Sequence, residues 1–171
     1  MQEQILEELK SEIKNRLVIE SIPRIKQCLE LLEEEEIWSR ANENTNAIGN
    51  LVLHLCGNVR QYLISSIGGA ADKRKRDNEF AKESRIEREE LIHALDMLEM
   101  EILHMIPGIT ISELLRIRTV QGFEMNGIQI IIHVIEHFSY HTGQIAFYVK
   151  QLKNVDLKFY GDLDLSKTGN I

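Results

Sequence analysis

Apolar residues recur every three or four positions along most of this chain, which is the pattern of helices that bury one face. The first such series consists of Ile5, Leu9, Ile13, Leu17, Ile25, Leu29 and Leu32. It predicts a helix over about 2–36. Pro23 falls inside that range, lacks a backbone donor and clashes with the preceding turn, so we expect a kink or break near residues 20–22.

A second apolar series predicts a helix from about Asn46 to Ile67, with Thr45 or Asn46 as its N-cap. The pair Gly68–Gly69 would end it, because glycine readily adopts the left-handed conformation that follows many helices. A polar loop is expected over 68–82.

The third helix is expected to begin at Ser84, because Ser84 and Glu87 have the S-x-x-E spacing of a capping box. It should end before the Pro-Gly pair at 107–108. The stretch 109–123 then leaves two alternatives open. Its partial alternation and β-branched residues favour a short strand or hairpin, whereas Thr110 and Glu113 would instead cap one helical turn.

The last helix is expected from near Asn126, where Gln129 stands at the reciprocal capping position, to about Leu152. In the tail, Phe159 and Tyr160 are expected to dock on the body of the protein. Four helices with only one short connection predict an all-α four-helix bundle with at least one crossover, and with a short irregular or β-like segment before the last helix. A chain of 171 residues is expected to form a single domain, 1–171.

Composition narrows the class of partner. The net charge of −7 argues against nucleic acid, because phosphate binding needs clustered cations. The one basic run, 73–76, lies in a polar segment and is interpreted as a solvated loop. No apolar run approaches the roughly 20 residues of a membrane span, and the acidic N-terminus does not resemble a signal peptide. The isolated Cys28 and Cys56 indicate buried free thiols, and the protein is expected in the reducing cytoplasm.

The histidines are the candidate metal-binding residues. His137 and His141 are four residues apart on the last helix, within or beside its apolar stripe, so their side chains can converge on one ion. Burying an imidazole without a partner would cost ~1–3 kcal/mol, and a shared ligand would remove that cost for both. His54, midway along the second helix, also borders the core. Three histidines from two facing helices predict a metal site with an open position for water or substrate.

The remaining histidines are weaker candidates. His133 is one turn before His137, but three ligands spread over two turns of one helix do not easily reach one ion. We therefore expect His133 to support the site from outside the ligand set. His93 and His104, on the third helix, are interpreted as surface or packing residues.

Other polar residues are spaced to orient the imidazoles through their second ring nitrogen. These candidates are Asn50 and Asn58, four residues either side of His54, and Glu136, Tyr140 and Gln144, near the His137–His141 pair. For the two asparagines, packing or hydrogen bonding between helices is an equal alternative. Gly57 and Gly143 lower helix propensity, which predicts a close approach of helices near the site.

Several stretches resemble the DinB-like (DinB/YfiT-type) superfamily of bacterial metalloenzymes, closest to its branch of uncharacterised conserved proteins. They are "EEEIWSRANENTN" (34–46), "NAIGNLVLHLCGNVRQYLISSIGG" (46–69), "DKRKRDNEF" (72–80) and "HVIEHFSYHTGQIAFYVKQL" (133–152). The resemblance implies a four-helix bundle with up-down-down-up topology, often a homodimer. It also implies a metal site of His54, His137 and His141, usually holding nickel or zinc. Some relatives are S-transferases or isomerases that use a low-molecular-weight thiol, and others hydrolyse amides.

The leading hypothesis is therefore a divalent-metal-dependent enzyme, a thiol-dependent S-transferase or a hydrolase, that acts on a small molecule. The ion would lower the pKa of a bound water or thiol and so supply a nucleophile at neutral pH. The alternatives are a non-catalytic dimeric metal-binding or stress-response module, and a metal-free ligand-binding bundle whose histidines pair with one another and with water.

Overall fold

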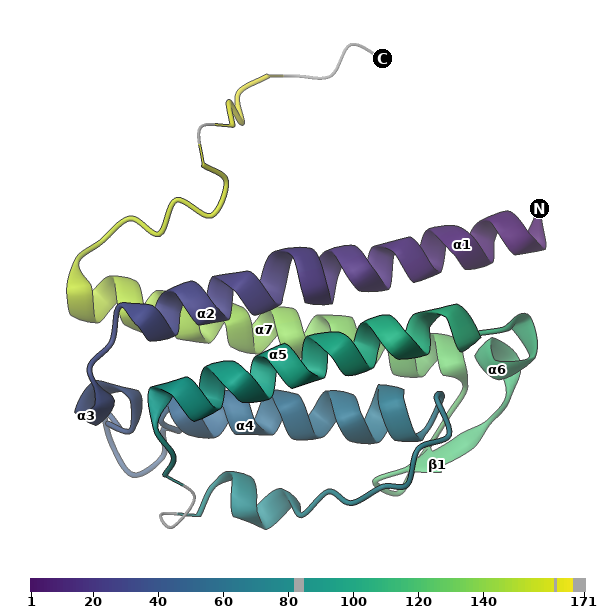
Figure 1. The fold of residues 1–171 in the computed structure, drawn as a ribbon, viewed down its shortest axis with the longest axis horizontal. Coiled ribbons are helices and arrows are strands. Elements are labelled where there is room, and N and C mark those ends of the chain that lie inside the picture. Colours follow the sequence, from purple (N-terminus) through teal and green to yellow (C-terminus); the bar gives the residue numbers. More distant parts are fainter. Residues whose placement is uncertain (82–84, 162, 168–171) are drawn as a thin grey trace.

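The computed structural model describes residues 1–81, 85–161 and 163–167. Its first long helix consists of α1 (Gln2–Ile13), a π-helical segment η1 (Lys14–Ser21) and α2 (Ile22–Glu30). Pro23 lies in the first turn of α2, and the helix continues through it (Figure 1). The wider π turn comes just before the proline, where a regular turn would meet its ring and lack its donor. The predicted kink or break is thus replaced by a change of helix type.

The long helix also ends earlier than predicted, at Glu30 rather than near residue 36. The chain turns and then forms the short helix α3 (Glu34–Ile37), whose capping box joins Glu33 and Glu36. Two negatively charged side chains at a helix start satisfy free N–H groups and favour a new helix there. The turn was not predicted because the apolar spacing continues across it.

The second long helix is α4 (Ile48–Val59), extended by the π-helical segment η2 (Arg60–Ser65). Its N-cap is Ala47, with no side-chain cap, so the predicted cap at Thr45 or Asn46 is wrong. The Thr45 hydroxyl is engaged elsewhere: it accepts from the Asn42 N–H at 3.1 Å and donates to the Asn42 carbonyl at 2.9 Å. That local turn competes with capping, as threonine side chains often do.

A long connection returns from the end of η2 along the bundle and contains the short 3₁₀ helix η3 (Arg76–Glu79) (Figure 1). It leads to α5 (Arg88–Met105), which ends before the Pro-Gly pair, as predicted, and is followed by the 3₁₀ turn η5 (Ile106–Gly108). The start of α5 differs from the prediction. Glu87 is the N-cap and forms a capping box with Glu90, so Glu87 occupies the first rather than the last position of the box. Ser84 lies outside the described residues.

Both alternatives for 109–123 are realised in succession. Thr110 caps the short helix α6 (Ile111–Leu115) by accepting from the Glu113 N–H at 3.3 Å. The antiparallel strands β1 (Arg118–Val120) and β2 (Phe123–Met125) follow, with Val120 opposite Phe123. Their two-residue turn has positive φ at both positions, as right-twisted hairpins require.

The last helix, α7 (Gly127–Lys153), begins as predicted. Asn126 and Gln129 form a capping box, with both hydrogen bonds at 2.9 Å. The helix ends at Asn154, which adopts the left-handed conformation. The tail folds back on the first helix: the Leu157 carbonyl accepts from Gln27 at 2.8 Å, and the Arg24 guanidinium lies 5.3 Å from the rings of Phe159 and Tyr160.

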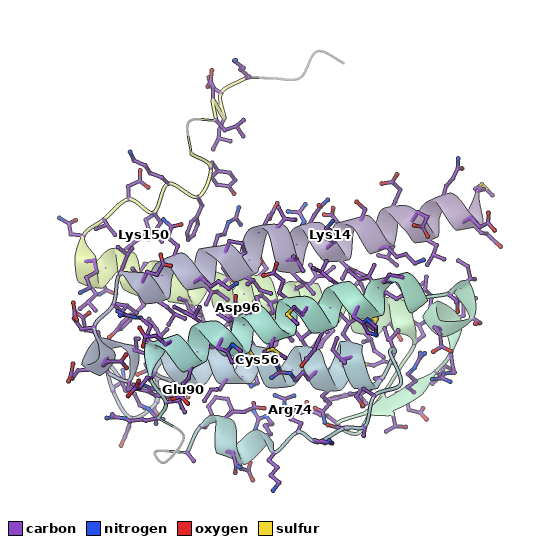
Figure 2. All side chains as sticks on the ribbon, viewed as in Figure 1. Lys14, Cys56, Arg74, Glu90, Asp96 and Lys150 are labelled. Atoms are coloured by element: carbon purple, nitrogen blue, oxygen red, sulfur yellow. The ribbon has the colours of Figure 1, made fainter. Side chains whose placement is uncertain are left out.

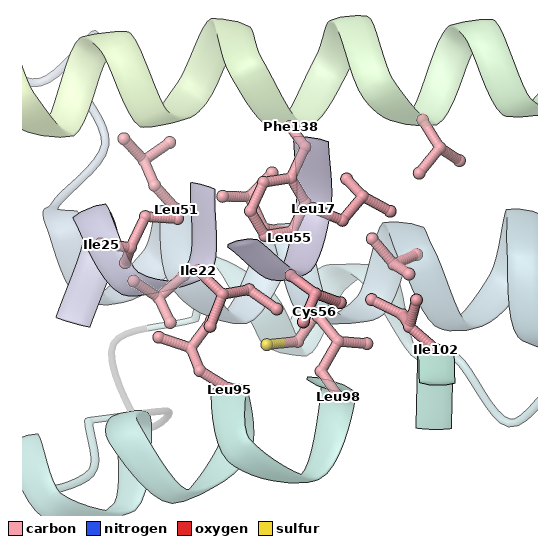
Figure 3. Close-up of a cluster of buried hydrophobic side chains, with 14 of the residues drawn as sticks. Leu17, Ile22, Ile25, Leu51, Leu55, Cys56, Leu95, Leu98, Ile102 and Phe138 are labelled. Atoms are coloured by element: carbon pink, nitrogen blue, oxygen red, sulfur yellow. The ribbon is translucent and has the colours of Figure 1, made fainter. Parts of the chain in front are cut away.

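The four long helices form the predicted bundle. The first and last run in one direction and the two middle helices in the other (Figure 1). Each of α2 and α4 packs against both α5 and α7. The shared core contains Leu17, Ile22, Ile25, Leu51, Leu55, Cys56, Leu95, Leu98, Ile102 and Phe138 (Figure 3).

Cys28 and Cys56 are buried free thiols, as predicted. Among the described residues, no helix is long and apolar enough to cross a membrane.

Candidate metal centre

His54 is near the middle of α4, and its imidazole is 9% exposed. Its Nδ1 atom lies 2.8 Å from the Oε2 atom of Glu79, at the end of η3. The connection between α4 and α5 therefore supplies a carboxylate to a histidine that precedes it by 25 residues. This contact fixes the ring of His54 on the side away from α7.

Glu79 is held in turn by Arg74. The Arg74 Nε atom donates to Oε1 at 2.6 Å and Nη2 donates to Oε2 at 2.9 Å, which is the bidentate geometry of strong arginine–carboxylate pairs. Arg74 also donates to the Oε1 atom of Gln61 at 2.9 Å, and its side chain is only 3% exposed. Burial alone would raise the pKa of the Glu79 carboxyl, but the hydrogen bonds with Arg74 and His54 lower it below its ordinary value. Glu79 is therefore a carboxylate at neutral pH.

The charge of Glu79 determines the tautomer of His54. A carboxylate can only accept, so Nδ1 of His54 carries the proton and Nε2 carries the lone pair. This Nε2 atom points at α7, where it lies 2.9 Å from Nε2 of His137. On the same helix, His141 Nδ1 lies 2.7 Å from the Gln144 side-chain oxygen. That oxygen also accepts, which leaves the Nε2 lone pair of His141 free as well.

The three predicted histidines thus come together between α4 and α7. One ring nitrogen from each of His54, His137 and His141 lies within 4.8 Å of the others. Burial, and then the neighbouring His141 and His54, lower the pKa of His137 to about 3. Burial likewise lowers the pKa of His141, against the opposing effect of the hydrogen bond that His141 donates to Gln144. Both rings are neutral at neutral pH, which is the protonation state that binds metals.

This donor set fits a divalent ion of the zinc type. Neutral imidazoles from two facing helices suit zinc, nickel, copper or iron, and three protein ligands leave a position open for another molecule. Two of the three rings already have the outer hydrogen-bond acceptor that metal-binding histidines usually have. The three histidines could therefore bind a metal ion through one ring nitrogen each.

The residues predicted to orient the histidines behave differently from one another. Gln144 contacts His141 as expected. Asn50 instead donates to the backbone carbonyl of Glu79 at 2.9 Å and accepts from Arg40, so it holds the chain that carries Glu79. Asn58 is buried, and its Oδ1 atom has no hydrogen-bond partner among the described residues. Among the described residues, neither asparagine forms a hydrogen bond with His54.

The candidates on α7 lie toward the outside. His133 stacks on His137 with ring centroids 5.5 Å apart and on Tyr62 at 4.5 Å. It is not in the converging group of three, and its buried Nε2 atom has no partner among the described residues. Tyr140 is exposed and places its ring 5.0 Å from that of His141. His93 and His104 are exposed on α5, as expected.

A cavity of about 390 Å³ opens beside the histidines on the α7 side. It is lined by His133, Glu136, His137, Ser139 and Tyr140. A ligand in this cavity would touch the ring of His137 directly, and the Glu136 carboxylate and Tyr140 hydroxyl would lie on its wall. The site is therefore buried on the α4 side and accessible on the α7 side.

Arg74 and Glu79 were missed by the sequence reasoning. The basic run 73–76 was interpreted as a solvated loop, which is correct for the exposed Lys73, Lys75 and Arg76 but wrong for Arg74. Gly57 was the available signal. A Cβ atom at Gly57 would lie 2.1 Å from Glu79 Oε1 and 3.0 Å from Arg74 Nε, so a glycine on α4 makes room for the pair.

The close approach predicted at glycines is thus present at Gly57, although the neighbour is a pair of loop side chains and not a helix. At Gly143 the same prediction is wrong. Apart from the neighbouring residues and backbone of α7 itself, no described atom lies within 4 Å of a Cβ built there, and the residue is exposed.

Comparison with known proteins places the chain by family and by fold. A family profile described as "Protein of unknown function (DUF1572)" matches residues 5–161. Among solved structures, the crystal structure of a DinB-like protein from Bacillus cereus ATCC 10987 is similar, with a TM-score of 0.62 and 14% sequence identity. The alignment covers 78% of this chain and 86% of that one. No curated protein matches the chain.

Proposed function

We propose, from the premise that this chain belongs to the DUF1572 family and has a DinB-like fold, that it is a divalent-metal-dependent enzyme acting on a small molecule. One observation carries the proposal. His54, His137 and His141 converge from two helices, with one ring nitrogen of each within 4.8 Å of the others, beside a cavity of about 390 Å³. Zinc or nickel is the proposed ion.

The site residues have two proposed roles, binding the ion and orienting its ligands. His54, His137 and His141 would hold the ion, and Glu79 and Gln144 keep the first and last of these rings in the metal-binding tautomer. A bound divalent ion lowers the pKa of a water or thiol beside it and so supplies a nucleophile at neutral pH.

The substrate would enter the cavity on the α7 side. Glu136 and Tyr140 lie on its wall and offer a proton acceptor and a proton donor to a bound molecule. Two reactions need this combination: transfer of a low-molecular-weight thiol to an electrophile, and hydrolysis of an amide. We place thiol transfer first, because the exposed cavity can admit a thiol and an electrophile together.

Metal analysis of protein purified without a histidine tag tests the first step. We expect about one zinc or nickel ion per chain. The matched control is His104→Ala, which removes an exposed histidine on α5 and should leave the metal content unchanged. A metal content below ~0.2 ions per chain that is the same in wild type and His141→Ala would refute the metal site.

A reaction panel tests the second step. The metal-loaded protein would be assayed with low-molecular-weight thiols and electrophiles and, separately, with amide substrates. Turnover that is lost in Glu136→Gln but not in His104→Ala would support the enzyme. A fully loaded protein without turnover on the panel would instead favour a non-catalytic metal-binding or stress-response module.

We also propose a homodimer in the cytoplasm. Several large apolar side chains are exposed on β2 and α7 and on the segment before β1: Ile117, Phe123, Ile128, Ile132 and Phe147. Of these, Ile128 and Ile132 are one turn apart on α7, and a dimer interface over this face would cover both. The two free thiols suit a reducing compartment. Sedimentation as a monomer at micromolar concentration would contradict the dimer.

A further inference from the structure

A second and larger cavity lies on the other side of the Arg74–Glu79 pair from His54. Its volume is about 730 Å³, within the usual range for small-molecule sites. It lies between α4, α5 and the connection that joins them, and none of the three site histidines is among its lining residues. Figure 2 labels Cys56 on α4 and Arg74 on the connection that passes alongside it. The cavity is therefore distinct from the opening next to His137.

The interior of this cavity is largely apolar. α4 and η2 contribute Leu53, Gly57 and Ile64, while Ile86 and Ala94 come from the start of α5 and the residues before it. Ala70 and Ala71 complete the wall from the connection. Small side chains at several of these positions leave the space open, and an apolar ligand body would remove both its own surface and these side chains from water.

Cations concentrate at the edge of the cavity, although the whole chain has a net charge of −7. Arg74 is neutralised by Glu79, and Arg60 by Glu101 at 2.7 Å. Lys73 and Lys75 are exposed, and neither has an ion-pair partner among the described residues. The remaining carboxylate of the lining, Asp72, accepts hydrogen bonds from Gln61 and from the Arg74 backbone N–H. Lys73 and Lys75 therefore leave this edge with a net positive charge.

We propose that this cavity is a binding site for a small amphiphilic anion. The ligand has an aliphatic or aromatic body, which fills the apolar interior, and one carboxylate or sulfonate group, which is held by Lys73 and Lys75. Because Arg74 and Glu79 form part of the wall, the ligand contacts the pair that orients His54 without entering the metal site. Binding at this cavity does not require a metal ion.

Fluorescence titration with 8-anilinonaphthalene-1-sulfonate tests the site, with decanoate as a competitor. The double variant Lys73→Glu/Lys75→Glu should weaken binding of both probes about tenfold or more, because two attractive charges become repulsive. The matched control is Lys14→Glu/Lys167→Glu, which makes the same change in net charge at exposed lysines away from the cavity. It should change the affinity by less than about twofold at physiological salt.

Two further variants distinguish binding in this cavity from binding elsewhere on the protein and from the metal site. Ala94→Phe should fill the cavity and displace the probe, provided that its circular dichroism and unfolding midpoint match those of the wild type. His141→Ala should lose metal and keep probe binding, so failure of the metal site and failure of this site are distinguishable. Equal losses in the two lysine variants, or unchanged binding in Lys73→Glu/Lys75→Glu, would overturn the proposal.

Discussion

On the α4 side of the histidine site, His54 donates to a carboxylate that is itself held by a guanidinium only 3% exposed. On the α7 side, His141 donates to the amide of the exposed Gln144. The first arrangement is charged, buried and anchored by a distant segment of the chain. The second is neutral, local to one helix and next to an accessible cavity. α4 thus provides a histidine whose ring is held in place, and α7 provides histidines that lie beside an open cavity.

Removing a ligand from either side should have the largest effect. We expect His54→Ala and His137→Ala to lose nearly all bound metal, from about one ion per chain to below ~0.2, because two imidazoles cannot hold the ion that three hold. Metal content of the two purified variants is the measurement. If His54→Ala kept its metal while His137→Ala lost it, the ion would belong to α7 alone and the two sides would not share a site.

The outer partners should show the difference between the sides. Glu79→Gln removes the charge that polarises His54 and leaves the Arg74 guanidinium buried without its carboxylate, so zinc affinity should fall about 10–100-fold. Gln144→Ala removes a neutral partner that water can replace, and its effect should stay below about tenfold. Competition with a zinc chelator measures both. Equal effects would show that burial and charge do not distinguish the two partners.

A pair of glycine substitutions tests the same contrast through packing. Gly57→Ala would place a methyl group 2.1 Å from Glu79 Oε1, so the Arg74–Glu79 pair must move, at a cost of about 1–3 kcal/mol in unfolding free energy. Gly143→Ala meets no described atom within 4 Å and should stabilise α7 by about 0.5–1 kcal/mol. Denaturant unfolding of both variants gives the two values. Stabilisation by Gly57→Ala would mean that the pair is not seated against α4.

The pH dependence of the metal-free protein tests the burial of His137. The pKa of His137 is lowered from 6.5 to about 3, so between these values the unfolded chain binds this proton and the native protein does not. The free energy of unfolding should therefore be highest above pH 6.5 and fall as the pH drops toward 3. Thermal unfolding of wild type and His137→Asn measures this, and the variant should have the shallower dependence. Parallel curves would contradict a buried, neutral His137.

The parts of the site that the sequence predicted are those specified by short-range spacing. His137 and His141 are one turn apart, and Gln144 is three residues beyond His141, so α7 alone brings them together. The start of α7 was equally local, because Asn126 and Gln129 cap it reciprocally. His54 was located by its place beside the core on an amphipathic helix, and the resemblance to a known superfamily implied the same three histidines.

The parts that were missed depend on contacts between distant segments. Whether Glu79 reaches His54 depends on the path of the connection after η2, and no periodicity in a polar loop encodes that path. The N-cap of α4 was misplaced for a related reason: Thr45 had two competing hydrogen-bonding options, and the turn with Asn42 prevailed. Gly57 marked a close approach, but a single glycine does not say which residue approaches.

The connection between α4 and α5 also divides the site between two pieces of chain. A cut near residue 70 would leave His54 on the N-terminal fragment, and Glu79, His137 and His141 on the C-terminal fragment. Neither fragment alone would have a complete set of ligands. If the ion binds as proposed, the two fragments would associate more tightly in the presence of zinc than in the presence of a chelator. The bundle could then be used as a split protein whose association reports the metal concentration.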